Sequence, residues 1–86
     1  MTRSEFEGLT REKKCKYVWN RCVFLATRFR QDADRRFRIN LYHNGHFFVE
    51  IWYNSEYHYI GDIVSFTDTD QLSPYVSEID LKAFQL

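Results

Sequence analysis

Apolar and polar residues alternate on both sides of Asn44-Gly45, from Arg35 to Asn54, and this is the pattern of a β-hairpin. The apolar positions are odd-numbered in both arms, so the length of the turn decides whether they share a face. A two-residue turn would set odd residues of one strand beside even residues of the other. A three-residue turn that begins at His43, with Gly45 left-handed, keeps the odd residues together. We therefore predict a bulged hairpin whose apolar face consists of Phe37, Ile39, Leu41, Phe47, Val49 and Ile51.

The same register predicts the composition of the opposite face. It sets Arg38 opposite Glu50 and Arg36 opposite Trp52, which are an opposite-charge pair and a cation–aromatic pair. Exposed aromatic rings beside arginine are typical of the residues that dominate protein interfaces. The predicted binding residues are Arg36, Arg38, Tyr42, Phe48 and Trp52. In the alternative interpretation, a helix covers the aromatic part of this face, which then forms a second layer of the core.

Two helices are predicted before the hairpin. Thr2 and Glu5 have the spacing of a capping box, and Gly8 suits a left-handed residue just past the helix end. Thr10 is the expected N-cap of the second helix. Four residues of that helix recur at helical spacing and predict its core stripe, namely Cys15, Val18, Trp19 and Cys22.

The segment Val23–Arg30 fits either continued helix or strand. Its β-branched and aromatic residues favour a strand, followed by a turn at residues 31–34. Residues 59–66 predict a further strand, in which Gly61 marks a bulge.

The chain after that strand is predicted to form a polar loop at residues 67–71 and then a helix that begins at Ser73-Pro74. Its apolar residues are expected to dock on the domain, and these are Val76, Ile79, Leu81 and Phe84. The predicted fold class is α+β: N-terminal helices followed by an antiparallel β-meander of three to four strands and a short C-terminal helix. Residues 1–86 form a single domain of this kind.

Charge is distributed unevenly along this neutral chain. Residues 1–38 carry a net charge of +6 and residues 39–86 a net charge of −6. The split is typical either of a basic surface for nucleic acid with an acidic tail, or of two halves that complement each other. We favour complementarity, because a neutral domain has no net positive field to steer polyanions.

The chain lacks the apolar stretch of a signal peptide and any run of transmembrane length, so we expect a cytoplasmic protein with no membrane contact. Cys15 and Cys22 would lie about 10.5 Å apart along one helix, too far for a disulfide, and are expected to be buried thiols.

Catalytic or metal chemistry has little support in the sequence. His43, His46 and His58 lie near predicted turns, but no Cys pair or Glu-His motif completes a zinc site. Neither cysteine belongs to a nucleophile pattern, and three glycines form no phosphate loop. We therefore expect no enzyme activity, no metal and no cofactor.

Several short motifs resemble a family of short, functionally uncharacterised bacterial proteins of the Bacteroidetes type. These motifs are Ser4-Glu5-Phe6, Glu12-Lys13 with Tyr17 and Trp19, Asn40-Leu41-Tyr42, residues 47–54, Pro74-Tyr75 and Ile79-Asp80-Leu81. They are core and turn residues, not a catalytic signature, and they span most of the chain. The resemblance implies the helix-then-meander layout, with residues 23–30 as a strand, and a bacterial cytoplasm. The arginine-rich stretch 28–38 departs from the family pattern.

The sequence does not name a ligand. The interpretation that it favours is a small non-catalytic protein-interaction module whose partner is another protein or a second copy of the chain, as in a homodimer. The alternative is a nucleic-acid-binding protein that uses a basic and aromatic sheet face, with Arg28 and Arg30 added to the binding residues above. Glu50 in the middle of that face argues against this alternative.

Overall fold

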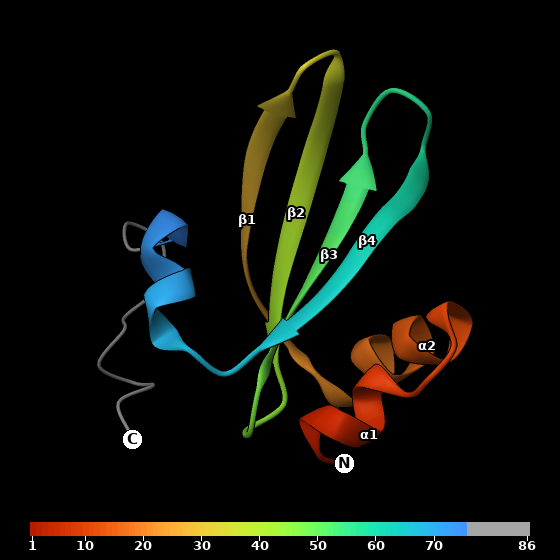
Figure 1. The fold of residues 1–86 in the computed structure, drawn as a ribbon, viewed down its shortest axis with the longest axis vertical. Helices are drawn as coiled ribbons and strands as arrows, with labels where there is room; N and C mark the ends of the chain where they lie inside the picture. Colours follow the sequence, from red (N-terminus) through yellow and green to blue (C-terminus); the bar gives the residue numbers. More distant parts are fainter. Residues whose placement is uncertain (76–86) are drawn as a thin grey trace.

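Helices, a four-stranded antiparallel meander and a 3-10 helix follow one another along the chain (Figure 1). The computed structural model describes residues 1–75. The elements are α1 (Arg3–Glu7), α2 (Arg11–Arg21), β1 (Val23–Asp32), β2 (Arg35–His43), β3 (Phe48–Asn54), β4 (Tyr59–Phe66) and the 3-10 helix η1 (Thr69–Tyr75). The strand order is β1-β2-β3-β4, so the predicted α+β class and meander are confirmed.

The helix starts were predicted correctly, and one helix end was not. The Thr2 hydroxyl accepts a hydrogen bond from the Glu5 amide at 3.1 Å, and Glu5 Oε1 accepts one from the Thr2 amide at 3.0 Å. Thr10 caps α2 through the amide of Lys13 at 3.3 Å. Gly8, however, has a right-handed φ of −79°, because the chain continues almost directly into the cap of α2. The predicted left-handed conformation of Gly8 is therefore wrong.

Residues 23–30 belong to β1, so the strand interpretation is confirmed. β1 is longer than predicted and runs to Asp32, which pairs with Arg35 across a two-residue turn. Ala33 in this turn has a positive φ of 52°. The ladder between β1 and β2 skips Leu25, which forms a bulge. A second bulge leaves Gly61 unpaired in β4, as its position predicted.

The predicted register of the β2–β3 hairpin is wrong. His43 pairs with Phe48, so the loop has four residues, 44–47, and odd residues of β2 lie opposite even residues of β3. The Asn44 side chain determines this loop, because its Oδ1 accepts hydrogen bonds from the amides of His46 at 2.9 Å and Phe47 at 3.0 Å. Gly45 is left-handed as predicted, with φ of 99°.

Phe47 explains why the parity changes. Its side chain leaves the ladder and enters the core, where its ring lies 5.4 Å from that of Phe6. Odd residues of β2 and even residues of β3 therefore lie on one face of the sheet, and even residues of β2 and odd residues of β3 lie on the other. We call the two faces the helix face (Tyr42, Val49, Ile51), which packs against α1 and α2, and the η1 face (Leu41, Phe48, Phe66), which packs against η1.

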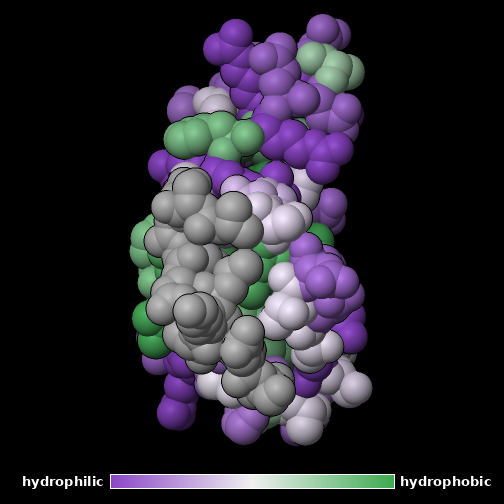
Figure 2. Space-filling view, turned by 90° about the vertical axis from the view of Figure 1, so that its left-hand side faces the viewer, coloured by the Kyte–Doolittle hydropathy of each residue, from purple (hydrophilic) through white to green (hydrophobic). Residues whose placement is uncertain are grey.

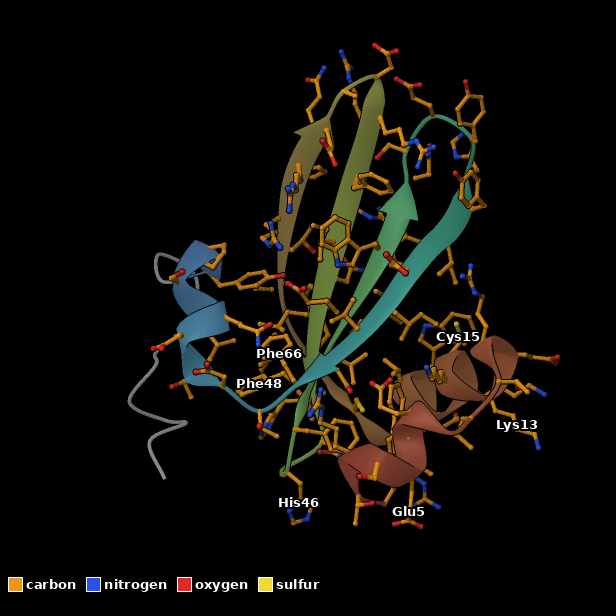
Figure 3. All side chains as sticks on the ribbon, in the orientation of Figure 1. Glu5, Lys13, Cys15, His46, Phe48 and Phe66 are labelled. Carbon is orange, nitrogen blue, oxygen red and sulfur yellow. The ribbon has the colours of Figure 1, made fainter. Side chains whose placement is uncertain are left out.

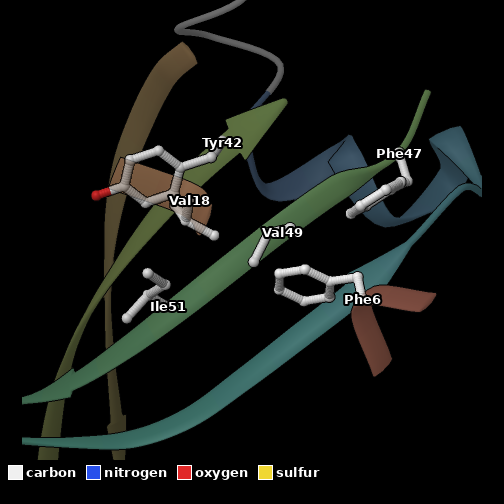
Figure 4. Close-up of a cluster of buried hydrophobic side chains, with 6 residues drawn as sticks. All are labelled: Phe6, Val18, Tyr42, Phe47, Val49 and Ile51. Carbon is white, nitrogen blue, oxygen red and sulfur yellow. The ribbon is translucent and has the colours of Figure 1, made fainter. Parts of the chain in front are cut away.

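The core consists of one layer on each of these faces. The layer on the helix face is drawn in Figure 4 and consists of Phe6, Val18, Tyr42, Phe47, Val49 and Ile51. The layer on the η1 face consists of Ala26, Leu41, Phe48, Phe66, Leu72 and Tyr75. Phe48 and Phe66 stack at 5.3 Å where the sheet meets η1 (Figure 3). The alternative of a second core layer is thus correct for Phe48.

The predicted core stripe of α2 is correct for three of its four residues. Cys15 and Val18 are buried and Cys22 is half-buried, with both thiols free. Burial raises the pKa of the Cys15 thiol and raises that of Cys22 to about 11. Trp19 is 58% exposed, because it lies at the border of the stripe, about 100° around the helix from Val18.

The C-terminal prediction is only partly confirmed. The 3-10 helix begins at Thr69, so the predicted loop at 67–71 and the start at Ser73-Pro74 are misplaced. The docking residues Val76, Ile79, Leu81 and Phe84 lie outside the described residues.

One end of the sheet extends beyond the helices. Both the β1–β2 and β3–β4 hairpins reach past α1, α2 and η1 (Figure 1), and we call this part the free end. Hydrophilic residues gather at the free end (Figure 2). Within residues 1–75, no helix has the length and apolar character that crossing a membrane requires.

Candidate interaction surface

A buried carboxylate lies under η1 in the middle of the sheet. Glu50 is 7% exposed, and its Oε2 lies 3.3 Å from Nη2 of Arg28. The hydroxyl of Tyr75 donates a hydrogen bond to the same oxygen at 2.5 Å. Trp52 Nε1 donates to Oε1 at 3.4 Å. We call Glu50, Arg28, Tyr75 and Trp52 the Glu50 cluster.

The Glu50 cluster has a structural role. A buried carboxylate costs several kcal/mol when it is left alone, and here a guanidinium and two neutral donors compensate for that cost. Burial, and then the hydrogen bond to Glu50, raise the pKa of the Tyr75 hydroxyl, so it stays a donor. Tyr75 thereby links η1 to the sheet. Both oxygens of Glu50 therefore accept hydrogen bonds within the cluster.

The predicted Arg38–Glu50 pair is wrong, since Glu50 lies opposite Leu41 and pairs with Arg28 from β1. The prediction that Arg36 lies opposite Trp52 is also wrong, because Ile39 occupies that position. Both errors follow from the register. The partners Arg28 and Tyr75 come from other elements, 22 and 25 residues away along the chain. No local pattern indicates such contacts.

The five predicted binding residues do not share one surface. Arg36, Arg38 and Tyr42 belong to the helix face, whereas Phe48 and Trp52 belong to the η1 face. Tyr42 and Phe48 are buried in the two core layers. Arg36 and Arg38 are exposed and Trp52 is half-buried, and these three lie toward the free end.

Arginine side chains already lie over the aromatic rings of the free end. The guanidinium groups of Arg28 and Arg30 each lie 5.6 Å from the Trp52 ring centre. The ring of Phe37 meets Trp52 edge-on at 5.4 Å. On the helix face, Arg38 lies 5.1 Å from the ring centre of Tyr53. These contacts reduce the ring area that a stacked base would need.

The free end carries exposed charges of both signs, because Asp32, Asp34 and Glu56 lie there beside four arginines. Arg30, Arg35, Arg36 and Arg38 are exposed, and none forms an ion pair with another residue of the described part of the chain. They lie on the two strands of one hairpin, Arg36 and Arg38 on the helix face and Arg30 and Arg35 on the η1 face. Arg36 and Arg38 are therefore the pair that offers positive charge on one face to an anionic partner.

The outer edge of β1 carries the most exposed apolar side chains of the sheet. β1 is an edge strand, and among residues 1–75 only β2 pairs with it. Val23 is 66% exposed, Phe24 53% and Phe29 76%. Figure 2, seen from the side of β1 and η1, shows hydrophobic residues on this side of the molecule. Exposed apolar residues on an edge strand favour pairing with another chain, whereas the Leu25 bulge and the charges of Arg28 and Arg30 in the same strand oppose it.

The three histidines lie at two places in the sheet. His43 and His46 lie at the β2–β3 loop, and His58 lies in the β3–β4 turn. His43 accepts a hydrogen bond from the Gly45 amide at 3.1 Å, and its ring lies 4.4 Å from that of Phe48. Burial, and then His46, lower the pKa of His43. His46 lies at the tip of its loop (Figure 3), and His58 lies in the β3–β4 turn with a positive φ of 56°. Within the described residues, no group of three metal-ligating side chains is present.

An apolar groove of about 550 Å³ lies between α2 and β4 and contains Cys15, Trp19 and Ile60. The Cys15 thiol in this groove is buried, and burial raises its pKa, so it is a poor nucleophile.

No family model, curated protein or solved structure matches this chain. The resemblance to the Bacteroidetes-type bacterial family is therefore untested and stays a prediction.

Proposed function

We propose that the protein is a small, non-catalytic protein-interaction module that binds a partner chain along the outer edge of β1. The observation that supports this most strongly is the exposure of Val23, Phe24 and Phe29 on an edge strand. An edge strand offers a row of backbone donors and acceptors, and apolar side chains beside that row add affinity when a partner covers them.

The absence of catalysis in this proposal rests on the state of the chemically active groups. The Glu50 carboxylate has donors on both oxygens. The thiols of Cys15 and Cys22 are protonated at neutral pH, because burial raises the pKa of each. His43 is partly buried against Phe48. Glu50 is thus held within its cluster, and the thiols and His43 are packed into the fold.

The test uses two matched aromatic residues. Phe29→Ser removes the ring at the β1 edge, and Tyr57→Ser removes an equally exposed ring, 72% exposed, at the β3–β4 turn. Each variant and the wild type serve as immobilised bait for extracts of the source cells, with chemical cross-linking and mass spectrometry as the readout. We expect a cross-linked partner chain, added copies of this protein included, with wild type and Tyr57→Ser but not with Phe29→Ser. Retention of the same partner by Phe29→Ser contradicts the proposal.

One observation favours nucleic acid as a second candidate partner, namely the four exposed arginines of the free end, which form no ion pair within residues 1–75. Fluorescence anisotropy with a labelled single-stranded oligonucleotide tests it. Binding that weakens steeply with salt, and that Arg36→Gln and Arg38→Gln reduce, supports this candidate. No binding at low salt refutes it.

A further inference from the structure

We propose that the partner of the β1 edge is a second copy of this chain, bound antiparallel about a two-fold axis through Thr27. The two sheets then join into one continuous sheet with β1 of each copy at the centre. This inference rests on the proposed function, since it assigns an occupant to the same edge. It is carried by the order of side chains along β1.

Three residues of β1 share the helix face. Phe24 pairs with Tyr42, Thr27 with Asn40 and Phe29 with Arg38. The residues that alternate with them, Ala26, Arg28 and Arg30, lie on the η1 face, since they pair with odd residues of β2. An axis perpendicular to the sheet sets each residue opposite one on its own face. Such an axis must therefore pass through a residue and not between two residues.

The bulge determines how the positions are counted. Leu25 is skipped in the ladder, so Phe24 lies two ladder positions before Thr27 and Phe29 lies two positions after it. An axis through Thr27 therefore sets Phe24 of each copy opposite Phe29 of the other. Both exposed rings gain an aromatic neighbour, and the two Thr27 side chains meet at the axis. Aromatic pairs and threonine pairs are favourable cross-strand neighbours.

The arginines of β1 select this axis over its neighbours. With the axis at Thr27, Arg28 lies opposite Ala26 and Arg30 opposite Val23 of the other copy. An axis at Phe29 would set Arg28 opposite Arg30, and an axis at Arg28 or Arg30 would set that residue opposite itself. Like charges directly opposite each other destabilise a sheet.

An axis at Ala26 also avoids arginine pairs. It would, however, leave Phe29, which is 76% exposed, beyond the end of the paired segment. Thr27 is therefore the centre that covers both phenylalanines without placing two arginines opposite each other.

The first experiment is disulfide cross-linking of a Thr27→Cys variant under mild oxidation. Directly opposite Cα atoms in antiparallel strands are about 4.5–5.5 Å apart, within the range that a disulfide spans. We expect Thr27→Cys to form a covalent dimer at micromolar protein concentration. The control variant Tyr57→Cys, with its cysteine at an exposed turn position, should not form one. The native thiols are controlled by treating the wild type in parallel, because Cys15 and Cys22 are free. Equal cross-linking of Thr27→Cys and Tyr57→Cys overturns the proposal.

The second experiment does not depend on the folding of the cysteine variant. Light scattering over a concentration series measures the dimer dissociation constant of the wild type and of Phe29→Ser. The dimer loses two aromatic pairs on this substitution, so we expect a dissociation constant at least about tenfold higher, and no change for Tyr57→Ser. A wild type that stays monomeric at high concentration refutes the second copy as occupant, and so does a dimer that Phe29→Ser leaves unchanged. If such a monomer still binds another protein through Phe29, the proposed function stands and this inference alone fails.

Discussion

Replacing Tyr75 with Phe tests whether the Glu50 cluster holds η1 on the sheet. The change removes the hydroxyl that donates to Glu50 Oε2 at 2.5 Å, while the buried ring can stay in its layer beside Leu72. A hydrogen bond to a charged group contributes about 1.5–3 kcal/mol to stability. Glu50 keeps its contacts with Arg28 and Trp52, so we place the loss at about 2 kcal/mol, in the lower part of that range.

The predicted loss is large enough to measure in two ways. For a domain of this size, about 2 kcal/mol lowers the Tm by about 8–16 °C, and urea denaturation gives the same free energy independently. Amide hydrogen exchange of residues 69–75 reports whether η1 opens before the sheet does. Tyr57→Phe is the control, because that hydroxyl belongs to an exposed residue of the β3–β4 turn.

A double-mutant cycle with Glu50→Gln isolates the pair. We expect Tyr75→Phe to cost clearly less in the Glu50→Gln background, since the charged acceptor is already absent. A Tyr75→Phe variant as stable as the wild type, with unchanged exchange in η1, would refute the role assigned to this hydrogen bond.

Three further predictions follow from single residues. Gly45→Ala should cost about 1–2 kcal/mol in urea denaturation, since its φ of 99° is strained for any side chain although no atom lies within 4 Å of the added Cβ; an unchanged midpoint would contradict this. Asn44→Ala should cost about 1–3 kcal/mol, because it leaves the amides of His46 and Phe47 without their acceptor, and a cost no larger than that of His46→Ala would exclude this explanation. Burial raises the pKa of Cys22 from its model-compound range near 9 to about 11, so the folded state holds the thiol proton longer than the unfolded state. The stability from this group is thus complete below about pH 9 and is lost as the pH rises toward 11, and Cys22→Ala should remove that part of the decline in thermal melts.

Local patterns were sufficient to predict the two helices and the four strands of this fold, although not the start of η1. The cap at Thr2 needs only Glu5 three residues on, and the strand at residues 23–30 follows from its β-branched and aromatic residues. Gly45 and Gly61 were identified correctly because a left-handed turn residue and a strand bulge both favour glycine.

The register could not be predicted in the same way. Phe47 has the composition of a strand residue, yet it leaves the ladder because the Phe6 side chain offers it a place in the core. That contact joins residues far apart in the sequence, and the shift that it causes moves every later residue of β3 to the other face. The same register error affected the candidate site. Phe48 and Trp52 were expected beside Arg36 and Arg38, but they lie on the opposite face of the sheet. Arg28 and Tyr75 were missed as partners of Glu50 because only the tertiary fold brings them there.

The position of η1 at the end of the described chain has a consequence for biosynthesis. When Phe66 has left the ribosome, the meander can pair all its strands, yet Leu41, Phe48 and Phe66 still lack the layer that η1 supplies. The nascent chain therefore exposes an apolar sheet face until Tyr75 emerges and reaches Glu50.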